Sequence, residues 1–187
     1  MLKQRTIAAP VKTVGIGLHT GRKVTLKLIP APINTGIIFH RIDLPDVPGI
    51  KADAHLVTDT RLATVLQNGD TRVSTVEHLL SGCAGLGIDN LIIELDCEEV
   101  PIMDGSAATF VFLIQSAGIV EQNAAKKFIK IKKKVSVSGP EGTRWHNQTA
   151  TIQPYNGFKV NHTIVYDNPV IKKQCATINF STTTFVK

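Results

Sequence analysis

Two adjacent side chains, Glu77 and His78, have the chemistry of a hydrolytic metal site. Neutral imidazole is a common zinc ligand, and a nearby carboxylate can take a proton from metal-bound water. The spacing of apolar residues predicts a short helix that Ser74 opens and Gly82 or Gly85 closes, with the pair in its first turn. On composition alone a structural role is favoured, because Ser74-Thr-Val-Glu77 fits a helix-capping box and no HExxH motif follows.

Two further polar residues lie in glycine-containing turns. His19 belongs to Gly15-Ile-Gly-Leu-His-Thr-Gly21, where exposed backbone N–H groups are suited to bind an anion. The alternative is a plain turn between strands, since the spacing is not the G-x-G-x-x-G of dinucleotide sites. Asp104, in Asp104-Gly105-Ser106, is typical first of a turn and a helix cap, and only second of a catalytic group.

The chain is basic, with 21 Lys and Arg against 15 Asp and Glu in 187 residues, a formal net charge of +6. Six lysines between Lys126 and Lys134 fall in or beside a strand-like run, Phe128 to Val137. We expect them to protect an open sheet edge, with phosphate contact as the alternative. Because aromatic residues make up 5% of the chain and none forms a stacking platform here, we expect no nucleic acid partner.

Cysteine use and hydropathy favour a cytoplasmic location. The three cysteines, Cys83, Cys97 and Cys175, are an odd number without CxxC spacing, which argues against a disulfide framework and a thiolate zinc cluster. The first residues contain no apolar run typical of a signal peptide. The longest strongly apolar uncharged stretch, Gly105 to Val120, is shorter than the ~20 residues that span a bilayer, so we expect no transmembrane segment.

The order of elements predicts an α+β fold. Strands are expected at residues 24–28, 37–40 and 90–95, and a second helix at 107–118 that Asp104 or Ser106 caps. A polar link at 121–125 follows. Beyond it, the order strand, proline, Asn/Gly turn, strand occurs again, with Pro154 in the place of Pro30, which indicates a duplication.

We therefore predict two similar sheet-and-helix domains, the second apparently truncated. Residues 1–125 form a first α+β domain carrying Glu77 and His78, and residues 126–187 an incomplete second domain of strands only. Without helices to cover its sheet, this second part should be poorly packed. Its apolar side chains are expected to be exposed, with these as candidates: Phe158, Val160, Ile164 and Ile178.

A set of motifs, taken together and in order, resembles one family, the UDP-3-O-acyl-N-acetylglucosamine deacetylases. These are zinc amidases of lipid A biosynthesis in Gram-negative bacteria. The segments that carry the resemblance are Lys3-Gln-Arg-Thr6, Gly15-Ile-Gly-Leu-His-Thr-Gly21, Pro30-Ala-Pro32 with Asn34-Thr-Gly36, Ser74-Thr-Val-Glu-His-Leu79, Gly85-Leu-Gly-Ile-Asp-Asn90, Pro101-Ile-Met-Asp-Gly-Ser-Ala107, Ala125-Lys-Lys-Phe128, Pro154-Tyr-Asn-Gly-Phe158 and Asn179-Phe-Ser181.

The resemblance implies metal-dependent hydrolysis of the N-acetyl group of UDP-3-O-acyl-N-acetylglucosamine, in a cleft between two similar α+β domains. By this resemblance His78 is a ligand of Zn²⁺, with iron as the alternative metal, and Glu77 is the general base. His19 is implied as substrate-side support, and Asp104 as a residue that orders a loop near the site.

The family's remaining site residues have no counterpart in this sequence. A second-domain H-K-x-x-x-D segment that supplies two further zinc ligands is missing, as are a later histidine and the passage that holds the acyl chain. We therefore expect this chain alone to be inactive, as a truncated enzyme. The alternative is a catalytically inactive truncated paralogue that acts as a binding or interaction protein. The segment from Gly139 to His146 is slightly longer than the family's usual connection and has no functional explanation.

Overall fold

The computed structural model describes residues 2–143, 145–180 and 185–186, and the chain divides after Lys126 into two compact units. Both helices and strands are present, which confirms the α+β class. The elements are β1 (Lys3–Ile7), β2 (Val11–Ile16), β3 (Lys23–Pro30), β4 (Ile37–Arg41), β5 (Ile50–Lys51), η1 (Ala54–Leu56), β6 (Val57–Asp59), β7 (Val65–Asn68), β8 (Thr71–Ser74), α1 (Glu77–Leu86), β9 (Leu91–Leu95), α2 (Ala108–Ser116), β10 (Ile119–Ala125), β11 (Val135–Ser138), β12 (Thr149–Ile152), β13 (Lys159–Val165) and β14 (Lys173–Asn179).

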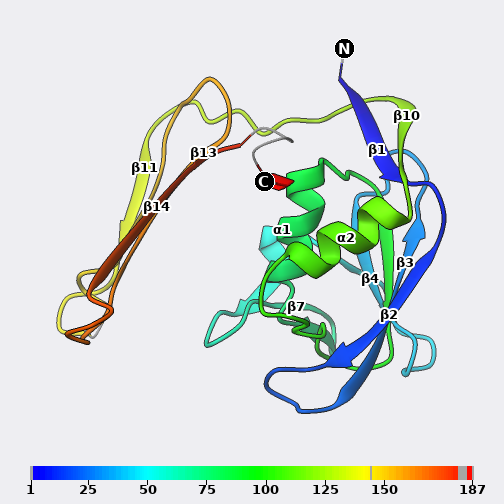
Figure 1. Ribbon diagram of the computed structural model, residues 1–187, viewed down its shortest axis with the longest axis horizontal. Coiled ribbons are helices and arrows are strands. Elements are labelled where there is room, and N and C mark those ends of the chain that lie inside the picture. The colour runs from blue at the N-terminus through cyan, green and yellow to red at the C-terminus, as the bar shows by residue number, and fades with distance from the viewer. Residues whose placement is uncertain (1, 144, 181–184, 187) are drawn as a thin grey trace. The chain divides into compact units, whose positions relative to one another are not determined.

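The first unit is built on a five-stranded sheet with the order β2-β3-β9-β4-β5 (Figure 1). Its neighbours are antiparallel except β4 and β9, which run parallel. The strands predicted at residues 24–28, 37–40 and 90–95 are present, but β9 lies between β3 and β4 and separates them. Alternate side chains of β3 and β9 point into the core, and the fully buried ones on these two strands are Val24, Leu26, Leu28, Leu91, Ile93 and Leu95.

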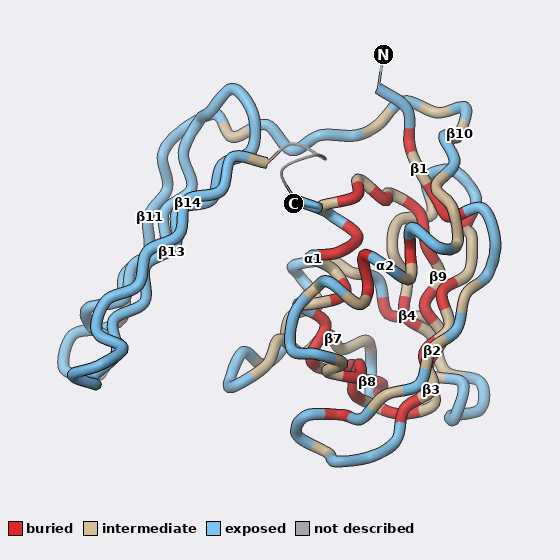
Figure 2. The backbone as a smooth tube through the Cα atoms, in the orientation of Figure 1, coloured by how far each residue is buried: buried red, intermediate tan, exposed pale blue. Residues whose placement is uncertain are grey.

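Two helices, α1 and α2, contact each other over the core of this unit (Figures 1 and 2). They bury Leu79 and Cys83 from α1 and Phe110 and Ile114 from α2. The predicted end of α1 at Gly82 or Gly85 is wrong, because the helix continues to Leu86. Gly82 permits close helix packing instead, since a Cβ there would lie 3.3 Å from Phe110 Cβ.

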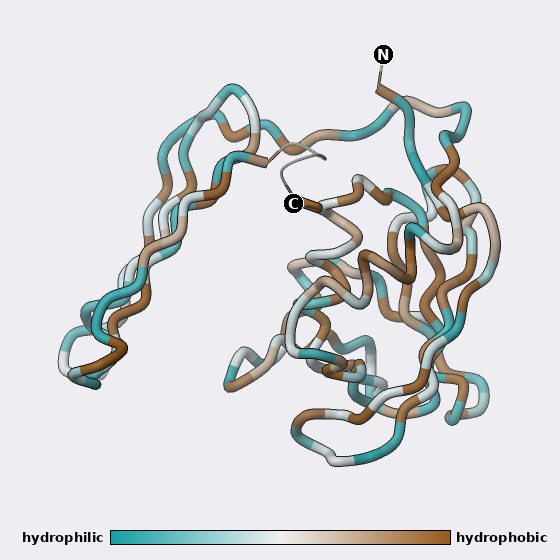
Figure 3. Tube along the Cα trace, viewed as in Figure 1, coloured by the Kyte–Doolittle hydropathy of each residue, from teal (hydrophilic) through white to brown (hydrophobic). Residues whose placement is uncertain are grey.

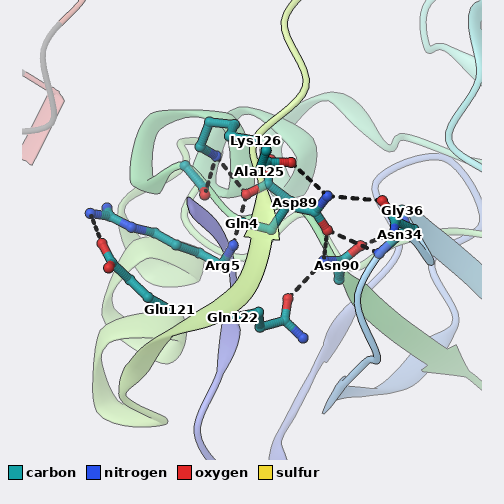
Figure 4. Close-up of polar contacts among 11 residues, drawn as sticks. Gln4, Arg5, Asn34, Gly36, Asp89, Asn90, Glu121, Gln122, Ala125 and Lys126 are labelled. Carbon is teal, nitrogen blue, oxygen red and sulfur yellow. Dashed lines mark hydrogen bonds and ion pairs between the residues drawn. The ribbon is translucent and has the colours of Figure 1, made fainter. Parts of the chain in front are cut away.

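A pair of strands, β1 and β10, completes the first unit. The prediction of a polar link at residues 121–125 is therefore wrong, because these residues form part of β10. Amide side chains join this pair to the sheet (Figure 4). Asn90 donates to Gln4 Oε1 at 2.8 Å and to Gln122 Oε1 at 2.7 Å, and it accepts from the Gly36 N–H at 2.9 Å. Lys126 Nζ donates to Asp89 Oδ2 at 2.5 Å and so ties the end of this unit to the turn after α1.

A smaller sheet, β6-β7-β8, brings the chain to the start of α1. Leu66 and Val73 are its buried apolar side chains, and Asn68 Nδ2 donates to the Gly49 carbonyl at 3.0 Å. Arg41 likewise donates to the carbonyl oxygen of Arg72 at 3.0 Å. The first bond joins β7 to the residue before β5 and the second joins β4 to β8, so the loop between β8 and α1 leaves a well-anchored strand.

In its described residues the second unit contains two hairpins, β11–β12 and β13–β14, whose strand residues are all exposed. Figure 3 shows hydrophobic segments along them. The predicted exposure of apolar residues is confirmed, from 37% for Val160 and Ile164 to 59% for Phe158. The predicted strand over residues 128–137 is wrong in its first part, because residues 126–134 are not in a strand and the lysines do not line a sheet edge. Residues 144, 181–184 and 187 of the predicted second domain lie outside the described residues.

No helix in the part of the chain that the structure describes is long and apolar enough to cross a membrane. The expected duplication stays a prediction. The order strand, proline, Asn/Gly turn, strand that suggested it is present in the second unit, because Pro154 and the Asn156-Gly157 turn fall between β12 and β13.

Candidate functional site

Helix α1 begins with the two residues that carry the predicted chemistry. Glu77 is its first residue and is exposed, and His78 is partly buried. A Glu77 carboxylate oxygen accepts the backbone N–H of Thr64, the residue before β7. The N-terminal end of the helix dipole also favours a negative charge at this position. Glu77 is thereby held in one orientation at the exposed end of α1.

The predicted capping box is wrong. Ser74 is the last residue of β8, and its N–H and hydroxyl both donate to the Glu98 carbonyl, at 2.8 and 3.3 Å. It is therefore engaged two residues before the N-cap, Val76, which makes no side-chain capping bond. Because tertiary pairing occupies Ser74, Glu77 takes no part in a capping box, and its carboxylate bonds to the Thr64 N–H instead.

The His19 turn does bind an anion, and that anion is a carboxylate of the same chain. Glu99 is fully buried. It accepts the backbone N–H of His19 at 3.0 Å and that of Thr20 at 2.8 Å. It also accepts the Thr75 hydroxyl at 3.0 Å. Burial raises the pKa of the Glu99 carboxyl, but the hydrogen bonds from His19, Thr20 and Thr75 outweigh it, so the pKa lies below its ordinary value.

Two glycines make this close approach possible. A Cβ at Gly17 would collide with the Glu99 carboxylate and with the Thr20 hydroxyl. A Cβ at Gly15 would lie 2.7 Å from Pro101 Cβ. Gly15 and Gly17 are thus required by contact with the segment that follows β9, which explains the spacing of these two glycines without a dinucleotide.

Glu99 was missed by reasoning from the sequence. It stands within Asp96-Cys-Glu-Glu-Val100, where Cys97 and Val100 are fully buried. A charged residue next to buried Val100, soon after a buried strand, was the available signal, because a buried charge needs several hydrogen bonds or a partner. Its partners lie up to 80 residues away, so the sequence could not name them.

Asp104 shapes the turn that leads into α2. Its Oδ1 accepts the Ser106 backbone N–H at 3.1 Å, and the Ser106 hydroxyl accepts the Ala108 N–H at 3.0 Å. The bonds from the Ser106 backbone and side chain lower the pKa of the Asp104 carboxyl. The prediction that Asp104 or Ser106 is the N-cap of α2 is wrong, since the N-cap is Ala107. The bond from the Ser106 N–H supports a turn-forming role of Asp104.

Comparison with known proteins identifies the family. Residues 4–187 match the family described as UDP-3-O-acyl N-acetylglycosamine deacetylase. The chain belongs to this family. It is similar to the UDP-3-O-acyl-N-acetylglucosamine deacetylase of Teredinibacter turnerae, with 59% identity over 189 residues, and to that of Saccharophagus degradans, with 57% identity. All of the chain is covered in both cases, and it spans 60% of the length of each relative.

A metal ion in a deacetylase site would need more ligands than the described residues of this chain bring together. The described residues contain no group of three or more His, Cys, Asp or Glu side chains that could hold a metal ion. A catalytic zinc normally has three protein ligands. His78 alone therefore does not fit a complete site, although its imidazole is a suitable single ligand.

Proposed function

We propose that this chain forms the first part of an enzyme that hydrolyses the N-acetyl group of UDP-3-O-acyl-N-acetylglucosamine in the cytoplasm. The observation that carries the proposal is the placement of Glu77 and His78 side by side at the start of α1, in a chain that matches the deacetylase family over residues 4–187. The substrate named for the two relatives supports the choice of substrate.

Each side chain has a distinct role in this proposal. Glu77 is the general base, with one carboxylate oxygen oriented by the Thr64 N–H. His78 is one metal ligand, and Zn²⁺ or iron, when bound with further ligands, supplies an activated water. His19 supports the substrate from the turn that Glu99 anchors, while Asp104 orders the turn before α2.

Substitution of Glu77 and His78 in the full-length protein tests these roles. Glu77→Gln should lower acetate release by at least about a hundredfold and leave metal content near normal, because it removes only a proton acceptor. His78→Ala should lower metal affinity as well. Glu121→Gln is the matched control, since Glu121 is an exposed carboxylate on β10. The roles would be abandoned if Glu77→Gln kept more than about a tenth of the turnover.

The 187-residue chain provides a second test. We expect no acetate release and only weak zinc binding, because one imidazole is far from three ligands. Native mass spectrometry after dialysis and an acetate assay measure both. Stoichiometric zinc would show that His19, His55 or a second chain completes the site. Substrate binding by the chain without turnover in any longer form would favour a binding protein instead.

A further inference from the structure

Thr75, which lies two residues before Glu77, has an unusual backbone conformation. Its φ is +58°, in the left-handed region, and its side chain is buried. For a β-branched residue this conformation is a genuine outlier that costs on the order of 1–3 kcal/mol. Such strain persists only where the surrounding structure determines the conformation, and it is concentrated at functional sites.

The contacts that determine this conformation come from the segment after β9. Ser74 pairs with it through two backbone bonds: Ser74 N–H donates to the Glu98 carbonyl at 2.8 Å, and Val100 N–H donates to the Ser74 carbonyl at 3.0 Å. The Thr75 hydroxyl then donates to Glu99 Oε1 at 3.0 Å. The direction in which the chain enters α1 is therefore set at Thr75, with Glu99 as its side-chain partner.

The same carboxylate holds the turn that carries His19. Its two oxygens accept the N–H groups of His19 and Thr20, and no ion pair involving Glu99 occurs within the described residues. A buried carboxylate of this kind is stabilised only while its donors stay in place, because an unpaired buried charge is costly. Loss of the donor on one side therefore weakens the constraint on the other.

We propose that Glu99 is a positioning residue that couples the His19 turn to the first turn of α1, through Thr75. By fixing both segments to one buried carboxylate, it keeps His19 in a constant relation to Glu77 and His78. The effect on turnover rests on the function proposed above, whereas the coupling itself does not and can be measured in the 187-residue chain.

Amide hydrogen exchange tests the coupling directly. Thr75→Val removes the hydroxyl and keeps the branched shape, and Thr75→Ser keeps the hydroxyl. We expect exchange at the His19 and Thr20 amides to become at least about tenfold faster in Thr75→Val and to stay near the original rate in Thr75→Ser. Thr58→Val, at an exposed threonine on β6, is the control. Unchanged exchange at His19 and Thr20 in Thr75→Val would overturn the proposal, because it would show that the Thr75 hydroxyl has no effect on the His19 turn.

Kinetics of the full-length protein separate positioning from general stability. Thr75→Val should lower kcat for acetate release by about tenfold or more with metal content and KM little changed, and Thr75→Ser should restore it. Glu77→Gln is measured in parallel. If Glu77→Gln abolishes turnover and Thr75→Val does not lower it, the coupling has no catalytic role and the proposal fails. If Glu77→Gln also keeps its turnover, the proposed function fails, and the exchange experiment still decides the coupling.

Discussion

Replacing Asn90 with alanine should be among the most destabilising single changes in the first unit. The Asn90 side chain is 1% exposed and makes three hydrogen bonds, with Gln4, Gln122 and Gly36. Each typically contributes about 1 kcal/mol, and a buried group left without a partner costs about 1–3 kcal/mol. Gln4 Oε1 keeps a second donor, the Asn34 N–H at 2.9 Å. We therefore expect a loss of about 3–5 kcal/mol in the free energy of unfolding.

Urea unfolding of the 187-residue chain, followed by far-ultraviolet circular dichroism and by amide exchange in β9, measures this loss. With an m-value of about 2 kcal/mol/M, the midpoint of the first unit should fall by about 1.5–2.5 M urea. Asn123→Ala, at an exposed asparagine on β10, should change the midpoint little. A loss below about 1 kcal/mol for Asn90→Ala, or one equal to that of the control, would refute the view that these bonds hold β1 and β10 to the sheet.

Further expectations concern packing, thiols and acid. Gly82→Ala should be close to neutral, because helix propensity offsets the tight contact with Phe110, whereas Gly82→Val should lower the free energy of unfolding by about 1–3 kcal/mol in the same urea assay; similar midpoints for both variants would contradict this. Burial raises the pKa of the Cys83 thiol to about 12. Iodoacetamide followed by mass spectrometry should therefore modify the exposed Cys175 in the native chain, and Cys83 only after unfolding. Because the pKa of Glu99 is lowered on folding, its stabilisation should be present above about pH 4.5 and be lost as the pH falls through the lower folded-state value. Acid titration by circular dichroism should show this dependence reduced in Glu99→Gln, and an unchanged acid transition would argue against it.

Local patterns predicted the two helices α1 and α2 and the strands β3, β4 and β9, and left the other strands of the first unit unpredicted. The alternation in β3 and β9 and the helical spacing around Leu79 and Cys83 depend on neighbours within a few residues, and the structure has these elements. Errors arose where distant pairing overrides local signals. Ser74 is bound to Glu98 instead of capping a helix, and the polar segment before Lys126 is a strand because β1 pairs with it.

The sequence by itself determined the α+β class, the family and the adjacency of Glu77 and His78, because these depend on residue types and their order along the chain. Only the tertiary structure decided which anion the His19 turn binds and why Thr75 takes a left-handed conformation. Glu99 is the anion in the His19 turn and also the side-chain partner of Thr75. Its carboxylate bonds to His19, 80 residues away along the chain, and to Thr75, 24 residues away. Such contacts arise because folding buries the end of β9 between two loops, and a buried charge must then find every donor within reach.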